Sequence, residues 1–215
     1  LIGPSGSGKT TLMKTIIGFY DQERGKVIID GRDLAKNKEE IRKIVGYSTQ
    51  EGCFYEELTV DENLRYFGRL YDLDDKTIKA RTDELLRLVQ LENTNKVLAE
   101  KLSGGMKRRL DLAIALIHSP KILILDELTT GLDPLLRIDI WNLIMQINKT
   151  GVTVIFSTHL LDEVEKSCNS LIMIKDGRII AYGNPKQLKN DYYDYEEIHL
   201  ETYPANYHKI IMSLD

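Results

Sequence analysis

The chain has 215 residues, of which 42% are hydrophobic and 29% charged, a composition typical of a globular protein. Its 33 acidic residues exceed its 29 Lys and Arg residues, and the formal charge of −4 argues against a protein that binds duplex nucleic acid by neutralising phosphates. No run of residues has the length of a transmembrane helix, no signal peptide is visible, and Cys53 and Cys168 lack CxxC spacing, so we expect free thiols in a reducing compartment.

The chain opens on the segment GPSGSGKT, residues 3–10, which fits the phosphate-binding loop G-x-x-x-x-G-K-[ST] at every specified position. Its glycines allow a tight turn that aims successive backbone N–H groups inward and forms a cradle for anions. Lys9 then supplies a positive charge for the outer phosphates, and Thr10 a hydroxyl for Mg²⁺. The pattern also predicts a helix over residues 10–19, whose N-terminus adds partial positive charge beneath the phosphates. These features indicate a site for a nucleoside triphosphate.

Strand patterns lie on both sides of this helix. The chain starts at Leu1 without a Met, and its first two residues resemble the end of a strand that feeds the loop. Because such a loop normally follows a complete strand, we expect N-terminal strands of the fold to be missing from this sequence. Residues 25–31 favour a short strand closed by an Asp-Gly turn, and residues 44–48 a second strand that delivers Gln50 at its end.

From residue 51 to about residue 99 the pattern becomes helical. Thr59 and Glu62 form a capping box for a helix that extends to about residue 71. Asp74 can cap a second helix, because Asp accepts hydrogen bonds from the first helical N–H groups. We interpret this stretch as a helical insertion into an α/β core. One face of the second helix is lined by Ile78, Thr82, Leu85 and Val89.

The remainder of the chain alternates helices with buried strands. Residues 102–106, LSGGM, precede a helix with an apolar stripe. Four consecutive apolar residues, 122–125, predict a parallel strand covered on both faces, and residues 152–157 predict another. Pro134 and Gly151 bracket a helix between them. This alternation predicts an α/β protein with a mostly parallel sheet. The apolar stripe consists of Leu110, Ala113, Ile114 and Ile117.

The last strands are predicted as a hairpin around Asp176-Gly177, formed by residues 171–174 and 178–181. Beyond residue 186 the chain becomes rich in Tyr, Asp and Glu, and we assign no chemistry to it. The predicted organisation is a discontinuous core over residues 1–50 and 119–190, a helical subdomain over residues 51–118, and a tail or accessory segment over residues 191–215.

Two carboxylates follow the buried strand at residues 122–125, at the strand end where α/β sheets place their ligands. Adjacent side chains on a strand point to opposite faces, so Asp126 and Glu127 should differ in role. Asp126 suits Mg²⁺, and Glu127 can accept a proton from an attacking water. His159 stands at another strand end, and Gln50 at a third; either residue alone would be weak evidence of a site.

Taken together, these segments resemble the nucleotide-binding domain of ABC transporters, over residues 1 to about 188. Met106 replaces the common glutamine of the signature, a variant of exporter-type, ABC-2-like members, and Leu128 replaces a proline. The family's adenine-stacking aromatic would lie before Leu1. In the family's order, the matches are residues 3–10 as Walker A, Gln50 as the Q-loop glutamine, residues 102–106 as the signature LSGGQ, residues 122–127 as Walker B with its catalytic glutamate, residues 131–134 as the D-loop, and His159 as the switch histidine.

The resemblance implies a head-to-tail homodimer, or a pair with another ABC subunit, that holds two ATP molecules between a phosphate loop and the partner's signature. It implies catalytic roles for Glu127, His159 and Gln50, and Mg²⁺ bound near Thr10, Gln50 and Asp126. The nucleotide would be bound by Gly3, Ser5, Gly6, Gly8, Lys9, Thr10, Thr11, Ser103, Gly104, Gly105 and Asp133.

The family further implies the ATP-hydrolysing motor subunit of a transporter. It would bind a separate integral membrane protein through the helical insertion, at the cytoplasmic face of the membrane and without contact to nucleic acid. An alternative is a soluble ABC ATPase that acts on ribosomes or DNA. The DNA-repair type has a long coiled coil between Walker A and the signature, for which there is no room here, and one domain with a short insertion disfavours the ribosomal type, which joins two such domains by a charged linker. A GTPase would need N-K-x-D, and residues 148–151, NKTG, lack the aspartate.

Overall fold

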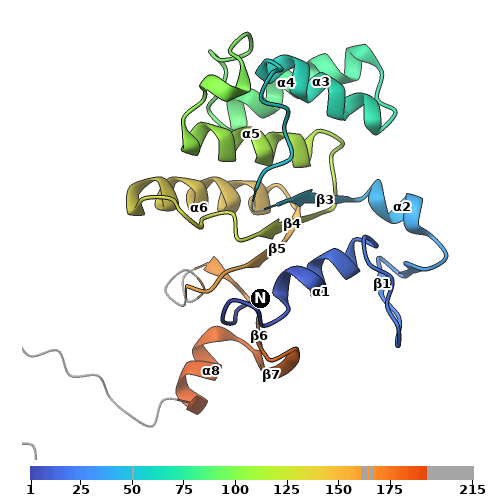
Figure 1. Cartoon of the computed structure of the whole chain (residues 1–215), viewed down its shortest axis with the longest axis vertical. Helices are drawn as coiled ribbons and strands as arrows, with labels where there is room; N and C mark the ends of the chain where they lie inside the picture. The colour runs from blue at the N-terminus through green and yellow to red at the C-terminus, as the bar shows by residue number, and fades with distance from the viewer. Residues whose placement is uncertain (50, 161–163, 165–166, 193–215) are drawn as a thin grey trace, which may run out of the picture.

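The computed structural model describes residues 1–49, 51–160, 164 and 167–192, which form an α/β fold (Figure 1). At its centre, strand β4 (Ile122–Asp126) lies parallel to and between β3 (Val45–Ser48) and β5 (Thr153–Ser157). Ile2 forms parallel bridges to Thr158 on one side and to Met173 on the other. The segment before the phosphate loop therefore joins the parallel strands to the antiparallel hairpin of β6 (Leu171–Lys175) and β7 (Arg178–Gly183). The predicted α/β class with a mostly parallel sheet is confirmed.

Strand β4 is apolar from Ile122 to Leu125, before its terminal Asp126, because both of its faces are covered. Leu123 and Leu125 belong to a large cluster that includes the helices of the upper layer in Figure 1. Ile124, which points to the opposite face, packs with Met13 and Val45 in a smaller cluster. Alternate side chains of a strand point to opposite faces, so a strand between two layers needs apolar residues at all positions.

The helices form layers on the two faces of this sheet (Figure 1). Helix α1 (Lys9–Ile16) lies on one face and contacts β4, while α6 (Pro134–Lys149) and α5 (Gly104–Leu116) lie on the other and contact β5 and β3. The helices α3 (Val60–Leu70) and α4 (Asp75–Leu88) pack on each other and on α5, farther from the sheet. This arrangement places the start of α1 and the start of α5 on different faces of the sheet.

Four helices begin at side-chain caps, of which those at Thr59 and Asp74 were predicted from the sequence. The capping box at Thr59 and Glu62 is complete in both directions. Asp74 accepts a hydrogen bond from Thr77 N, and Ser103 accepts one from Met106 N. Asp133 caps α6 by accepting from the N–H groups of residues 135 and 136. Each cap satisfies helical N–H groups that have no partner within the helix, and so defines the residue at which the helix begins.

The predicted strand over residues 25–31 is corrected by the structure to a small hairpin of β1 (Ile28–Ile29) and β2 (Arg32–Asp33). Asp30 and Gly31 both have positive φ, which reverses the chain after only two paired residues. The predicted helix over residues 10–19 ends earlier, at Ile16, because Gly18 adopts a φ of 73° and terminates it. Short helices that the patterns did not predict are α2 (Lys38–Arg42), the 3₁₀ turn η1 (Ala99–Lys101) and α8 (Pro185–Tyr192).

A single hydrophobic cluster connects the helical segment with the sheet. Leu64 of α3, Leu110 of α5 and Ile140 of α6 all belong to it and are at most 1% exposed. The division into a discontinuous core and a helical subdomain therefore crosses a continuous core, and it stays a prediction. Residues 193–215 of the predicted tail lie outside the described residues. No helix in the described part of the chain combines the length and the hydrophobicity needed to cross a membrane.

A half-buried histidine just after α5 contacts β3 and the end of α3. The ring of His118 stacks on Tyr71, with 3.7 Å between ring centroids, and its Nε2 lies 3.2 Å from the carbonyl oxygen of Val45. The pKa of His118 is lowered to about 4, mainly by burial and to a lesser degree by the charge of Arg81, while the hydrogen bond to Val45 opposes the shift. The folded protein therefore holds this ring neutral at a pH where an unfolded chain would protonate it.

We expect stability to fall as the pH drops from about 6.5, the ordinary pKa of histidine, toward 4. In that window the unfolded chain binds a proton that the folded protein does not, which costs up to about 1.4 kcal/mol per pH unit. The free energy of unfolding, measured with urea at several pH values, should depend less steeply on pH in His118→Gln than in the wild type. His159→Gln, at a side chain that is 38% exposed, serves as the control. Equal slopes for His118→Gln and the wild type would contradict the expectation.

Candidate active site

The phosphate loop, residues 3–8, has the backbone shape that its glycines predict. Gly6 and Gly8 have φ values of 79° and 101°, in the region where residues with a Cβ are strained. A Cβ at Gly3 would lie 2.1 Å from the carbonyl oxygen of Ile174, so only glycine fits there. Gly177, in the turn between β6 and β7, donates a hydrogen bond of 3.1 Å to Ser7 O and supports the loop from outside. The loop is thus held in a shape suited to binding an anion.

Lys9 points back into this loop. Its side chain is 4% exposed, and its Nζ donates to the carbonyl oxygens of Gly3 and Pro4 at 2.9 and 3.1 Å. The same Nζ lies 3.4 Å from Glu127 Oε1. Ser7 Oγ is buried beside this lysine's loop and has no hydrogen-bond partner among the described residues. A buried ammonium and an unpartnered hydroxyl at the start of a helix form a suitable site for phosphate oxygens.

The two acidic residues at the end of β4 have different surroundings. Asp126 is 3% exposed; its Oδ1 accepts from Ser157 Oγ at 2.6 Å and its Oδ2 from Tyr47 OH at 3.4 Å. Glu127 leaves the strand with a φ of 49°, and its N–H donates to Ser157 Oγ at 3.1 Å. Backbone strain of this kind is concentrated at functional sites, where the surrounding structure holds it in place. The turn directs the second carboxylate toward the phosphate loop.

Glu127 brings three segments of the chain together. Its Oε1 faces Lys9, and its Oε2 accepts from Thr130 Oγ1 at 3.2 Å. His159 Nδ1, which follows β5, lies 3.7 Å from the same Oε2. The carboxylate is 14% exposed, so a water molecule can reach it while the lysine and the histidine hold its orientation. A carboxylate so placed can accept a proton from water beside a bound phosphate.

Other residues implied by the family resemblance lie around this centre or apart from it. Thr10 and Thr11 are in the first turn of α1, Ser5 is in the loop, and all three are exposed. Ser103, Gly104 and Gly105 begin α5, on the other face of the sheet from α1 (Figure 1), so the structure does not bring them to the phosphate loop. Gln50 lies outside the described residues.

Asp133 acts within its own helix, since its Oδ1 accepts from Leu135 N and Leu136 N at 3.0 Å. Leu136 in turn lies against the start of α5, because a Cβ at Gly105 would be 3.1 Å from Leu136 Cδ2. The beginnings of α5 and α6 are therefore neighbours, and the residues implied to act across a dimer interface gather at one place on the chain.

Four residues of the site were not predicted from the sequence: Ser7, Tyr47, Thr130 and Ser157. Ser157 is directly opposite Asp126 in the parallel register of β4 and β5, a pairing that only the sheet reveals. Burial and the charge of Asp126 raise the pKa of Tyr47, so its hydroxyl stays protonated and donates to that carboxylate. The one local signal was the position of Ser157 and Tyr47 at the ends of predicted strands.

The donor set near the loop fits Mg²⁺. This ion prefers oxygen ligands and usually binds one or two carboxylates together with substrate phosphates. Asp126 and the Thr10 hydroxyl offer such oxygens, although the described residues contain no cluster of three or more Asp, Glu, His or Cys that could hold a metal by itself.

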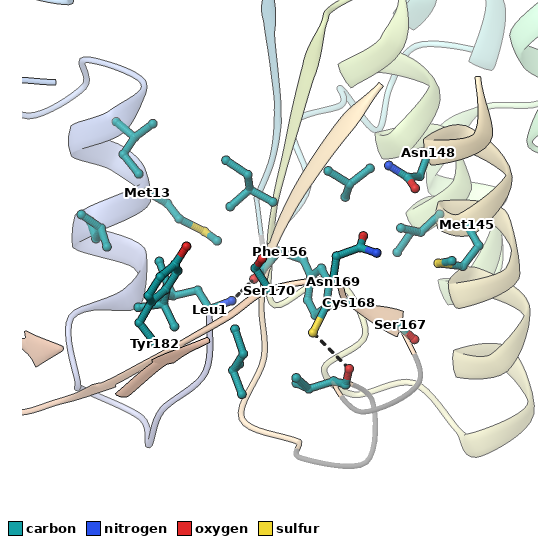
Figure 2. A pocket seen from close by; sticks show the side chains of 18 residues that line it. Leu1, Met13, Met145, Asn148, Phe156, Ser167, Cys168, Asn169, Ser170 and Tyr182 are labelled. Carbon is teal, nitrogen blue, oxygen red and sulfur yellow. Dashed lines mark hydrogen bonds between the residues drawn. The ribbon is translucent and has the colours of Figure 1, made fainter. Parts of the chain in front are cut away.

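A separate cavity of about 340 Å³ lies between α1, β5 and α6 (Figure 2). Its lining is largely apolar, with Met13 on one side and Met145 and Asn148 on the other. None of residues 3–10, Asp126 or Glu127 lines it. The candidate active site is therefore the loop and strand ends described above, and not this cavity.

The fold and the site together define a P-loop nucleotide-binding protein. Residues 1–130 match the family model described as ABC transporter, and the chain belongs to this family, as the motifs predicted. It is 38% identical to the linearmycin resistance ATP-binding protein LnrL of Bacillus subtilis, over 87% of this chain and 60% of that protein. It is 39% identical to the Nod factor export ATP-binding protein I of Neorhizobium galegae, over 89% and 55%.

An ABC transporter G family member 23 of Dictyostelium discoideum is 43% identical over 89% of this chain, but over only 27% of its own length. The chain thus spans between about a quarter and three fifths of these curated relatives. Among solved structures, cbiO1 of Clostridium perfringens, part of the ABC transporter complex cbiONQ, matches with a TM-score of 0.81 and 30% identity, over 88% of this chain and 78% of that one. The ADP conformation of MJ1267 matches with a TM-score of 0.78 and 28% identity, over 88% and 81%.

Proposed function

We propose that this chain binds and hydrolyses ATP as the motor of an ABC transporter. The observation that supports this most directly is the contact of 3.4 Å between Lys9 and Glu127, which places a phosphate-binding cation beside a carboxylate that can activate water. Both side chains are largely buried, at 4% and 14% exposure, so their interactions with a phosphate would be little screened by solvent.

In this proposal each residue contributes positioning or charge. The N–H groups of the phosphate loop and Lys9 hold the β- and γ-phosphates, and Mg²⁺, when bound near Asp126 and Thr10, neutralises phosphate charge. Glu127 accepts the proton of the attacking water. His159, 3.7 Å from Glu127, holds that carboxylate in position beside the terminal phosphate. Gln50 is assigned to the same site by the family resemblance alone.

The complete site would form between two copies of the domain, or between this chain and a paired ABC subunit. Ser103 and Gly104 are exposed at the start of α5, where free N–H groups and the helix dipole favour an anion. The phosphate loop of the same chain lies at the other face of the sheet, so a second molecule is needed to bring a signature segment to it. Asp133, beside the start of α5, would lie in the same interface.

The transporter assignment comes from the relatives, whose names describe ATP-binding proteins of linearmycin resistance and of Nod factor export. The solved structure of cbiO1 is described as part of a transporter complex. We propose that this chain likewise works with an integral membrane subunit, at the cytoplasmic face of the membrane. Co-purification of the complete protein with a membrane subunit tests this. Isolation with ribosomes or DNA would favour the soluble alternative.

Lys9→Ala tests the nucleotide site itself. The change removes a charged donor that contacts the phosphates in the ground state, so we expect ATP binding to weaken by about ten- to a hundredfold. Titration calorimetry with Mg·ATP measures it, after circular dichroism has shown that the variant is folded. Lys14→Ala, in the last turn of the same helix, is the matched control and should bind as the wild type does. Unchanged affinity for Lys9→Ala would remove this lysine from the site.

A further inference from the structure

Helix α5 carries a carboxyl group that is completely buried. Asp111 is 0% exposed, and its neighbours Leu110 and Leu112 in the chain are equally buried in the hydrophobic core. Burial raises the pKa of Asp111. A carboxyl group in such a position destabilises a fold unless several hydrogen bonds satisfy it, and an apolar residue would avoid that cost. The partners of Asp111 therefore indicate what the residue does.

Within the described part of the chain, three hydrogen bonds to Asp111 come from Ser48, at the end of β3, and from Cys53, which follows it. Ser48 Oγ donates to Asp111 Oδ2. Cys53 donates twice to Oδ1, from its backbone N–H at 2.9 Å and from its thiol at 3.0 Å. Ser48 is the last residue of β3, and Gln50 lies between Ser48 and Cys53 in the sequence. One side chain of α5 thus binds Ser48 and Cys53, which lie on either side of Gln50 in the sequence.

The same strand end is connected to the metal-binding candidate Asp126. Tyr47 precedes Ser48, and its hydroxyl lies 3.4 Å from Asp126 Oδ2. Strand β3 also lies close against α5 at Gly46, where a Cβ would be 2.2 Å from the carbonyl oxygen of Ala115. A displacement of α5 would therefore act on the end of β3, and through it on the residues beside Asp126.

We propose that Asp111 is a positioning residue that ties the helix beginning at Ser103 to the segment from Ser48 to Cys53. The inference rests on the proposed ATP hydrolysis, because it assigns Asp111 a role in that reaction. The start of α5 and the two residues bound by Asp111, Ser48 and Cys53, then move as one unit. When the signature end of α5 engages nucleotide, Asp111 transmits its position to the β3 side of the active site.

The test compares Asp111→Ala, Asp111→Asn and Leu112→Ala in the complete protein. We expect Asp111→Ala to lower kcat by about tenfold, the effect of losing a hydrogen bond to a charged group, with a change in the KM for ATP of less than about threefold. Asp111→Asn should recover most of this loss, since its amide oxygen can accept from Cys53 and its amide nitrogen can donate to Ser48. Leu112→Ala perturbs the same helix without touching this network and controls for lost stability.

A second readout uses the thiol of Cys53, in a Cys168→Ser background so that only one cysteine remains. Burial and Asp111 raise the pKa of the Cys53 thiol, which slows its reaction with iodoacetamide. Asp111→Ala should accelerate this reaction by about tenfold, and Leu112→Ala should not. The inference is overturned if Asp111→Ala keeps the wild-type kcat, or if Leu112→Ala loses as much turnover. Absence of hydrolysis by the wild-type protein would instead overturn the proposed function.

Discussion

Glu127→Gln is expected to retain Mg·ATP binding and to lose turnover by about a hundredfold or more, the usual contribution of a general base. The amide has the shape of the carboxylate and keeps an oxygen for Lys9 at Oε1, 3.4 Å away in the wild type. It cannot accept a proton from the attacking water. The variant should therefore keep its affinity for Mg·ATP and lose hydrolysis, since only hydrolysis requires a base.

Single-turnover hydrolysis of bound ATP measures this directly, because it excludes product release. Glu92→Gln makes the same chemical change at an exposed position on the helical side of the molecule, and should hydrolyse ATP at the wild-type rate. A Glu127→Gln protein that hydrolyses at that rate would show that another group takes the proton. Weakened binding with unchanged chemistry would mean that Glu127 acts only through Lys9.

Mixing two inactive variants should restore activity if the site is shared between two molecules. Ser103→Arg blocks the signature and Lys9→Ala breaks the phosphate loop, so each homodimer should be inactive. A mixed dimer has one interface with both defects and another with neither. Hydrolysis should therefore return to about half the wild-type rate per mixed dimer when the two sites act independently, and to less when they are coupled.

Two controls are needed, one for the loss of the helix cap at Ser103 and one for coupling between the two nucleotide sites of the dimer. Ser103 caps α5, so its replacement also costs about 1 kcal/mol of stability. Ser103→Ala removes the cap without adding bulk, and should leave a measurable rate where Ser103→Arg does not. A mixture of wild-type protein with the double variant shows how much activity one intact interface supports. If mixed dimers form and remain inactive while this mixture is active, Ser103 does not act on the partner's nucleotide.

The sequence by itself determined the parts of this protein that follow from short-range physics. The phosphate loop is one, because positive φ at Gly6 and Gly8 is a property of glycine at those positions. The starts of α3 and α6 are others, since a capping side chain satisfies N–H groups only two or three residues away. The buried strand β4 was predictable from the apolar run at residues 122–125, because a strand covered on both faces carries apolar side chains on both. Family membership followed from the order of the motifs.

Only the tertiary structure decided which of these parts meet. Ser157 reaches Asp126 through the pairing of β4 with β5, across 31 positions of the chain, and Lys9 reaches Glu127 across 118. Asp111 looks, in sequence, like one polar residue within an apolar stripe, and its role appears once α5 packs on β3. Such contacts depend on strand register and on the packing of distant segments, which no local pattern of residues encodes. The placement of the phosphate loop and the signature on different faces of the sheet arises in the same way, from the order in which the chain adds strands and helices to a common core.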